Sequence, residues 1–170
     1  MGPDTSGFQE EIDPHMAEKT SARKTARGAA AKKRFDGFTD EEKGAMQSRV
    51  REMKRGAEVN WEGEVQEKIA GFSPVDRALA KRVHAVVKGN APQLESKLWY
   101  GMPAYYRDGK LVCHFQPAQK FKTRYATLGF SDNAKLDEGS IWPVAYALKE
   151  LTATEEAKIV ALLKKALGGA

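Results

Sequence analysis

The sequence feature that most constrains the fold is a two-residue turn, Asp108-Gly109, within an aromatic-rich stretch that runs from residue 94 to residue 130. Asp-Gly is a favoured pair for the type I′ turn, because that turn needs a positive φ at both positions. The turn predicts a β-hairpin in which Arg107 pairs with Lys110. More than half of the chain's aromatic residues fall in this stretch, which is typical of strands.

The register of this hairpin predicts which side chains share a face of the sheet, because successive strand residues point to opposite sides. Counted outward from the turn, Tyr105 faces Val112 and Ala104 faces Cys113. One face should be apolar and pack against helices, and the other should face water or a partner. The first face collects Met102, Ala104, Tyr106, Leu111, Cys113 and Phe115, and the second collects Tyr105, Val112, His114 and Gln116.

Helix signals flank the hairpin on both sides. Thr39 and Thr152 each precede a Glu by three positions, the spacing of a capping box. Ser73 before Pro74 is a typical helix start, and Asn60 opens a helix that Gly71 ends. Apolar residues at helical spacing predict the buried side of each helix. They are Met46, Val50 and Met53; Trp61, Val65 and Ile69; Val75, Leu79, Val83 and Val86; and Ile159, Leu163 and Ala166.

Two further strands are predicted, over residues 120–130 and 141–148. The order is then three helices, an antiparallel meander and a last helix. This order favours an α+β fold, a two-layer sandwich in which helices cover one face of an antiparallel sheet.

Charge divides the chain into three parts. The net charge of +5 comprises −4 over residues 1–16 and +6 over residues 17–34, with the remainder on the rest of the chain. His15-Met16 after the acidic segment suggests that residues 1–16 are a leader left by cloning. Residues 17–37 lack enough apolar surface to fold and are predicted to be a disordered basic tail. Residues 38–170 are predicted to form a single domain.

Composition excludes several classes of protein. No apolar run reaches the roughly 18 to 20 residues of a membrane span. A single Cys cannot form an internal disulfide, which favours a reducing compartment, the cytoplasm. Cys113 and His114 are adjacent on a strand and point to opposite faces, so they cannot bind one ion together. Cys113 is predicted to be a buried core thiol.

Three groups of charged residues are candidate binding sites. His84 shares a helical stripe with Arg77, Lys81 and Lys88, and a solvated basic face is the favoured interpretation. An acidic patch of Glu62, Glu64 and Glu67 has hard oxygen ligands for a weakly held cation, although a solvated helix face is favoured. Lys120, Lys122 and Arg124 would line one strand face, either to bind an anion or phosphate or, the favoured alternative, to discourage edge pairing.

A small ligand pocket is predicted at the open face of the sheet. Its candidate residues combine aromatic rings, an imidazole and two cations: Trp99, Tyr105, His114, Lys122 and Arg124. The alternative is that Trp99 and Met102 are core residues and that Gly101 and Pro103 only shape the chain.

The run WYGMPAY at residues 99–105, followed by the Asp-Gly-Lys turn, resembles the YdhG-like family of small bacterial proteins. Residues 129–151 also look like the actinobacterial branch of that family, and the likeness covers roughly Trp61 to Leu167. The resemblance implies a compact fold compared with frataxin and, for one branch, an intracellular iron chaperone. Frataxin iron sites lie on an acidic ridge, whereas the helix at residues 74–89 is basic here. Only the Glu62, Glu64 and Glu67 patch is acidic.

The function expected from this resemblance is a cytoplasmic, non-enzymatic domain that binds a small ligand or a metal ion, with iron as the implied metal. No phosphate-cradling Gly-rich loop, G-x-S-x-G elbow or H-E-x-x-H motif points to an enzyme, and no other cofactor is evident. The alternative is an interaction module whose basic tail, Lys19–Arg34, binds nucleic acid.

Overall fold

A computed structural model describes residues 37–55 and 59–169 of the chain. Residues 39–170 form one compact unit. The predicted leader, residues 1–16, and residues 17–36 of the predicted basic tail lie outside the described residues. Among the helices of the described part, none is long and apolar enough to cross a membrane.

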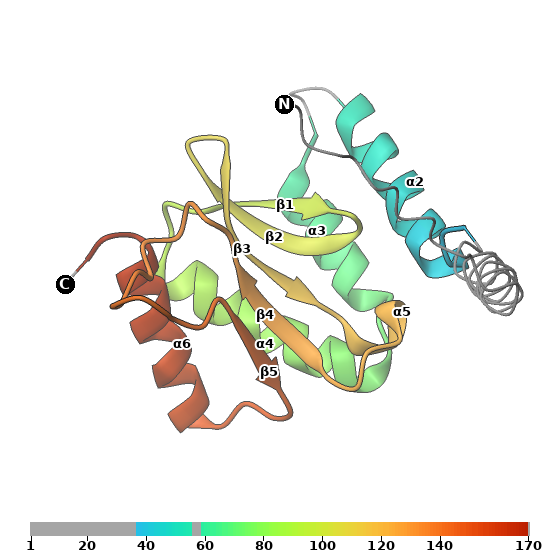
Figure 1. The fold of residues 1–170 in the computed structure, drawn as a ribbon. Helices are drawn as coiled ribbons and strands as arrows, with labels where there is room; N and C mark the ends of the chain where they lie inside the picture. The colour runs from blue at the N-terminus through green and yellow to red at the C-terminus, as the bar shows by residue number, and fades with distance from the viewer. Residues whose placement is uncertain (1–36, 56–58, 170) are drawn as a thin grey trace, which may run out of the picture. The chain divides into compact units, whose positions relative to one another are not determined.

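The described part of the chain has the α+β architecture that the sequence predicts. Its five strands form one antiparallel sheet in the order β1-β2-β3-β4-β5, so every strand pairs with its neighbours along the chain (Figure 1). The elements are α2 (Asp40–Lys54), α3 (Trp61–Ala70), α4 (Pro74–Asn90), β1 (Glu95–Trp99), β2 (Met102–Arg107), β3 (Lys110–Gln116), α5 (Ala118–Phe121), β4 (Ala126–Phe130), β5 (Ala145–Leu148) and α6 (Ala153–Ala166).

The predicted helix starts are confirmed. Thr39 and Thr152 form capping boxes at α2 and α6, and the Ser73 hydroxyl accepts a hydrogen bond from the Asp76 amide at the start of α4. Asn60 caps α3 by accepting from the Gly63 amide. Each cap satisfies a backbone donor that has no partner inside its helix.

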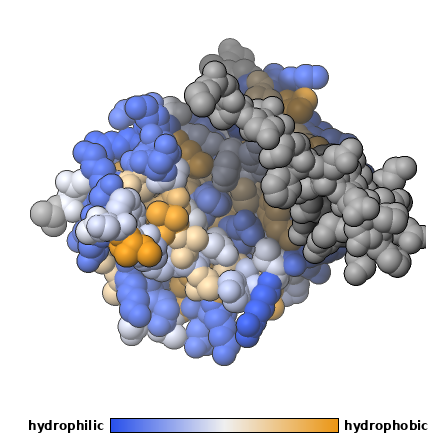
Figure 2. Space-filling model, viewed as in Figure 1, coloured by the Kyte–Doolittle hydropathy of each residue, from blue (hydrophilic) through white to orange (hydrophobic). Residues whose placement is uncertain are grey.

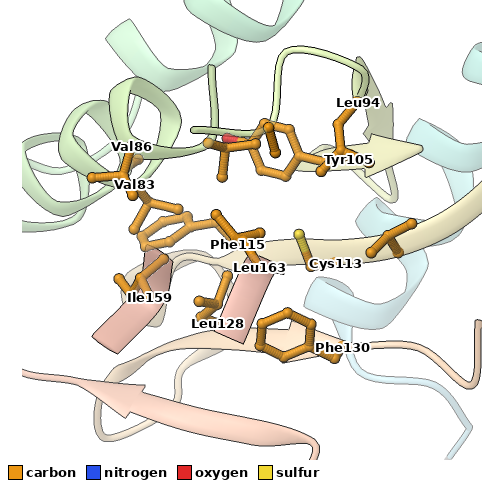
Figure 3. Packing of buried hydrophobic residues seen from close by; sticks show 14 of the residues in the cluster. Val83, Val86, Leu94, Tyr105, Cys113, Phe115, Leu128, Phe130, Ile159 and Leu163 are labelled. Carbon is orange, nitrogen blue, oxygen red and sulfur yellow. The ribbon is translucent and has the colours of Figure 1, made fainter. Parts of the chain in front are cut away.

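The hydrophobic core lies between one face of the sheet and α3, α4 and α6. Val83 and Val86 from α4 face Phe115 and Leu128 of the sheet, and Leu163 closes the layer from α6 (Figure 3). Cys113 is fully buried in this core, as predicted. The pKa of its thiol is raised by burial to about 12, so it is protonated and unreactive at neutral pH.

The predicted hairpin turn is confirmed, but its register is wrong beyond Tyr106. Asp108 and Gly109 have φ values of 51° and 74°, and Arg107 pairs with Lys110. The register then shifts, so that Tyr105 pairs with Cys113 and Ala104 pairs with His114.

The shift is a β-bulge that leaves Val112 without a partner on β2. The bulge lets two successive side chains, Val112 and Cys113, both join the core. Tyr105 therefore faces the helices with Cys113, whereas Ala104 shares the opposite face with His114. The prediction that Tyr105 and Val112 lie on the face toward water or a partner is therefore wrong, because both are buried in the core.

The strand predicted for residues 120–130 begins only at Ala126. Residues Ala118–Phe121 form the short helix α5, and Lys122 follows in a left-handed conformation with a φ of 51°. The alternation that placed Lys120, Lys122 and Arg124 on one strand face therefore does not exist. The strand predicted for residues 141–148 is likewise shorter and spans Ala145–Leu148.

Two apolar stripes that periodicity predicted as buried are exposed in part. Met46, Val50 and Met53 on α2 are exposed, as is Val75 in the first turn of α4, with 69% of its surface accessible. Leu79, Val83 and Val86 are buried as expected. Figure 2 shows that the apolar groups on the face viewed there are small and bordered by hydrophilic side chains.

Candidate functional site

The turn between β1 and β2 has an uncommon backbone. Trp99 pairs with Met102, so Tyr100 and Gly101 alone make the turn. Their φ values are 54° and 70°, both in the left-handed region. A bulky residue such as Tyr100 rarely adopts this conformation, and it persists only where its surroundings hold it there.

Two charged side chains from other elements hold this turn. The buried carboxylate of Glu52 on α2 accepts hydrogen bonds from the Tyr100 amide at 3.0 Å and the Gly101 amide at 2.7 Å. The Lys120 ammonium group on α5 donates to the Tyr100 carbonyl at 2.6 Å. The turn is thus held through its amides by an anion and through its carbonyl by a cation.

Gly101 leaves the space into which two lysines converge. A Cβ atom at this position would collide with Lys120 Nζ and lie 3.3 Å from Lys68 Cε and 3.4 Å from Ser48 Oγ. Within the described residues, no carboxylate lies within 4.0 Å of the ammonium group of Lys68 or Lys120. The two cations therefore stand close together without a neutralising ion pair.

A cavity opens beside these lysines, where the end of α3, the start of α4 and α5 meet. Its volume is about 360 Å³, enough for a small metabolite. We call it the Lys68–Lys120 cavity. Its walls are Lys68, Gly71, Phe72, Ser73, Asp76, Pro117, Gln119 and Lys120.

The carboxylate in this wall is already engaged. Asp76 is 3% exposed, and its two oxygens accept hydrogen bonds from the Ala118 amide at 3.0 Å and the Gln119 amide at 2.9 Å. These are the first amides of α5, which have no partners inside so short a helix. Asp76 thereby positions α5 and, with it, the side chain of Lys120.

Burial and the positive charge of Lys68 lower the pKa of Lys120, the Glu52 carboxylate acts in the opposite direction, and the net result is a pKa of about 8. Both desolvation and a nearby like charge disfavour the charged ammonium form of a lysine, so both lower its pKa. A negatively charged group in the cavity would offset the repulsion by Lys68.

A second cavity, of about 420 Å³, shares Lys68 and Gly71 with the first. It lies toward α2 and carries both signs of charge. Its acidic residues are Glu52, Glu64 and Glu67, and its basic residues are Arg51, Arg55 and Lys68. The mixed lining makes this second cavity less selective for an anion than the Lys68–Lys120 cavity.

The structure separates the five residues of the predicted open-face pocket. Trp99 and His114 lie together, with ring centroids 4.9 Å apart, but they fill the space against each other. Tyr105 lies on the other face of the sheet, in the core. Lys122 forms an ion pair with Glu41 of α2, and Arg124 lies against the ring of the exposed Tyr125. These residues therefore do not form one pocket.

His114 is neutral at physiological pH, because burial lowers the pKa of its imidazole to about 4. Its Nδ1 atom is buried without a hydrogen-bond partner. The ring lies against Gly129, where a Cβ atom would come within 2.7 Å of Nε2. His114 thus occupies a closely fitted site on the sheet.

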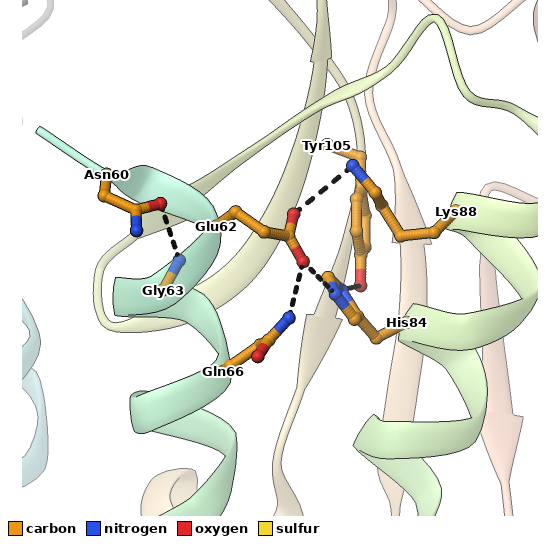
Figure 4. Close-up of polar contacts among 7 residues, drawn as sticks. All are labelled: Asn60, Glu62, Gly63, Gln66, His84, Lys88 and Tyr105. Carbon is orange, nitrogen blue, oxygen red and sulfur yellow. Dashed lines mark hydrogen bonds and ion pairs between the residues drawn. The ribbon is translucent and has the colours of Figure 1, made fainter.

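The interpretation of His84 as a solvated basic residue is wrong. Its Nε2 lies 2.7 Å from a Glu62 oxygen, and its Nδ1 lies 3.2 Å from the buried Tyr105 hydroxyl (Figure 4). Gln66 donates to the same Glu62 oxygen, and Lys88 lies 3.3 Å from the other. The chain of contacts connects α3, α4 and β2 and serves the packing of these elements.

The acidic patch does not fit an iron ion. Glu62 is engaged by His84, Gln66 and Lys88, and Glu64 by Arg55. Across residues 37–55 and 59–169, no three His, Cys, Asp or Glu side chains are grouped so as to hold a metal. A cation at this patch would have to displace the existing partners of Glu62 and Glu64.

The Glu62 contacts make the stability of the protein depend on pH in the acid range. Burial raises the pKa of Glu62, but hydrogen bonds from Gln66 and His84 outweigh it and lower the pKa from 4.5 to about 2. In this pH range the folded protein then binds fewer protons than the unfolded chain. The contribution of Glu62 to the free energy of unfolding is therefore complete above pH 4.5 and is lost as the pH falls toward 2.

We expect Glu62→Gln to lower the free energy of unfolding at pH 7 and to flatten its decline between pH 4.5 and pH 2. Urea denaturation at a series of pH values measures both effects. Glu150→Gln, at an exposed position, is the control and should follow the wild-type curve. Parallel curves for Glu62→Gln and the wild type would contradict the assignment.

Sequence reasoning missed Glu52, Lys68 and Asp76 as site residues, because each lies on a helix where a charged side chain usually faces water. It named Lys120 but placed it on a strand. One signal was present in the sequence: Tyr100-Gly101 lies between two β-prone runs, as a two-residue hairpin turn would.

Comparison of the chain with protein-family models, with curated proteins and with solved structures finds no significant match. The resemblance of the WYGMPAY run to the YdhG-like family therefore stays a prediction from the sequence.

Proposed function

We propose that this chain is a cytoplasmic ligand-binding domain and that its ligand is a small anion held in the Lys68–Lys120 cavity. One observation carries the proposal: two lysines converge beside a cavity of about 360 Å³ with no carboxylate paired to either among the described residues. Carboxylate and phosphate groups are the usual partners of such ammonium groups. The single, buried cysteine supports the cytoplasmic location.

The cavity is suited to an anion in two further respects. Asp76, the one carboxylate in its described lining, is directed at α5, where both of its oxygens accept backbone hydrogen bonds. The apolar walls at Phe72 and Pro117 exclude water on one side, which strengthens charge interactions inside the cavity.

The other functions expected from the sequence have less support. Iron handling would need ligands from Glu62, Glu64 and Glu67, and the first two of these carboxylates already have partners. Nucleic-acid binding through Lys19–Arg34 involves residues outside the described part of the chain, and it rests on the charge count alone.

We expect Lys68→Met to weaken the binding of inorganic phosphate or malonate about tenfold or more. A hydrogen bond to a charged group contributes about 1.5 to 3 kcal/mol, and each 1.4 kcal/mol is about a tenfold change in affinity. Titrations of the full chain, followed by the amide shifts of Gly71, Ser73 and Gln119, measure both the affinity and the location of binding.

Lys81→Met is the matched control, because Lys81 is an exposed lysine on α4 that does not line the cavity. It should bind the same anions as tightly as the wild type. If Lys68→Met and Lys81→Met weaken binding equally, or if the amides of the cavity do not shift, the proposed function is wrong.

A further inference from the structure

We propose that Lys120 is a nucleophile that forms a reversible imine with a small carbonyl compound bearing a carboxylate, such as a 2-oxo acid. The inference rests on the proposed function, because the carboxylate of this compound would occupy the anion site beside Lys68. Beyond anion binding, the inference adds the formation of a covalent bond and restricts the ligand to an anion that also carries a carbonyl group.

The geometry favours Lys120 over the other lysines of the described part. Lys120 lines the cavity, and its ammonium group is fixed by the hydrogen bond to the Tyr100 carbonyl, at 2.6 Å. Gly101 has no side chain that would displace it, and α5 is anchored by Asp76. The nitrogen is thus fixed and half-buried instead of moving freely in water.

The neighbourhood also provides amine in the reactive form. Burial and the nearby Lys68 charge lower the pKa of Lys120 to about 8, so a usable fraction is unprotonated near neutral pH. A ligand carboxylate paired with Lys68 would offset the Lys68 charge, but burial, the larger cause, would remain. A lysine with an ordinary pKa near 10.4 has roughly 100-fold less free amine at the same pH. Desolvation and a second cation are the established means of activating a lysine toward carbonyl groups.

The two lysines would have different tasks. Lys68 would hold the carboxylate through an ion pair and keep the carbonyl carbon near Lys120. The Lys120 lone pair would attack that carbon and open the C=O π bond, and a proton would pass from the nitrogen to the oxygen to give a carbinolamine. Loss of water would then leave the imine, and hydrolysis would reverse both steps. No oxidant or reductant is needed.

Reductive trapping tests the inference. The full chain is incubated with limiting glyoxylate and cyanoborohydride, and the modified lysines are located by peptide mapping. We expect Lys120 to be labelled about tenfold or more faster than the other lysines, in keeping with its larger free-amine fraction. Its labelling should reach half of its maximum near pH 8, whereas labelling of exposed lysines should continue to rise to higher pH.

Substitutions at three lysines distinguish imine formation by Lys120 from binding through its positive charge. Lys120→Arg keeps the positive charge, so it should still bind phosphate but lose the selective label. Lys122→Arg is the matched control two residues away, and it should leave labelling of Lys120 unchanged. Lys68→Met should reduce labelling by glyoxylate more than labelling by propanal, which has no carboxylate.

The outcomes distinguish this inference from the function on which it rests. If phosphate shifts the cavity amides but Lys120 is labelled no faster than Lys122, the imine is excluded and anion binding stands. If phosphate shifts no cavity amide, the anion site is wrong and the imine falls with it. Equal loss of glyoxylate and propanal labelling in Lys68→Met would exclude the carboxylate contact.

Discussion

Asp76→Ala is expected to lower the free energy of unfolding by about 2 to 3 kcal/mol. The substitution leaves the Ala118 and Gln119 amides without their acceptor at a site that is 3% exposed. Hydrogen bonds to a charged group contribute about 1.5 to 3 kcal/mol, and an unpaired buried donor costs a similar amount. Urea denaturation at pH 7 measures the change through the midpoint concentration.

The same variant should also damage the anion site, because α5 positions Lys120. Asp76→Asn keeps one acceptor oxygen and should lose less stability than Asp76→Ala. Asp137→Ala, at an exposed loop position, is the control and should change stability by no more than about 0.5 kcal/mol. Equal stability of Asp76→Ala and Asp137→Ala would show that the α5 amides find water or another partner.

Gly129→Ala is expected to destabilise the protein by about 1 to 3 kcal/mol, the usual cost of adding a methyl group to a filled site. The new Cβ would lie 2.7 Å from Nε2 and 3.2 Å from Nδ1 of His114. The imidazole has little freedom to move away, because the indole of Trp99 packs against it at 4.9 Å. Denaturation by urea measures this loss as well.

A double-mutant cycle identifies the cause. His114→Ala removes the obstructing ring, so adding Gly129→Ala to it should cost about 1 kcal/mol less than adding it to the wild type. Gly89→Ala is the matched control, because this glycine lies in α4 with open space around it. It should be neutral or stabilising, since alanine favours helix. Additive costs for Gly129→Ala and His114→Ala would refute the clash.

Helix caps and tight turns could be predicted from the sequence, because the interactions that form them involve residues that are neighbours in the chain. The capping residues Thr39, Ser73 and Thr152 act within three positions along the chain. The Asp108-Gly109 turn likewise depends on two φ angles that few other residue pairs adopt easily. These features required no knowledge of the rest of the molecule.

The predictions of the hairpin register and of a strand over residues 120–130 were wrong in part, because residues distant in sequence determine the local structure there. The bulge at Val112 places two successive side chains of β3 in a core that helices distant in sequence complete. The helix α5 replaces a predicted strand because Asp76, some 40 positions earlier, satisfies its first amides. The alternation of residue types over 120–125 cannot predict this contact with Asp76.

The residues of the candidate site were even harder to predict from the sequence, because they come from distant parts of the chain. Lys68 and Glu52 lie on separate helices, and only the folded chain brings them to the Tyr100-Gly101 turn. His84 was predicted to lie on a solvated basic face, because its partners Glu62 and Tyr105 lie more than 20 positions away on either side.

The strand order, which repeats the chain order, has a consequence for how quickly the protein assembles. Each strand pairs with the next one along the chain, and the first two connections are two-residue turns. Closing such short loops costs little chain entropy, so the hairpins can form early and independently. Docking of α6 against α4 joins segments that the entire sheet separates in sequence, which makes it the step expected to set the folding rate.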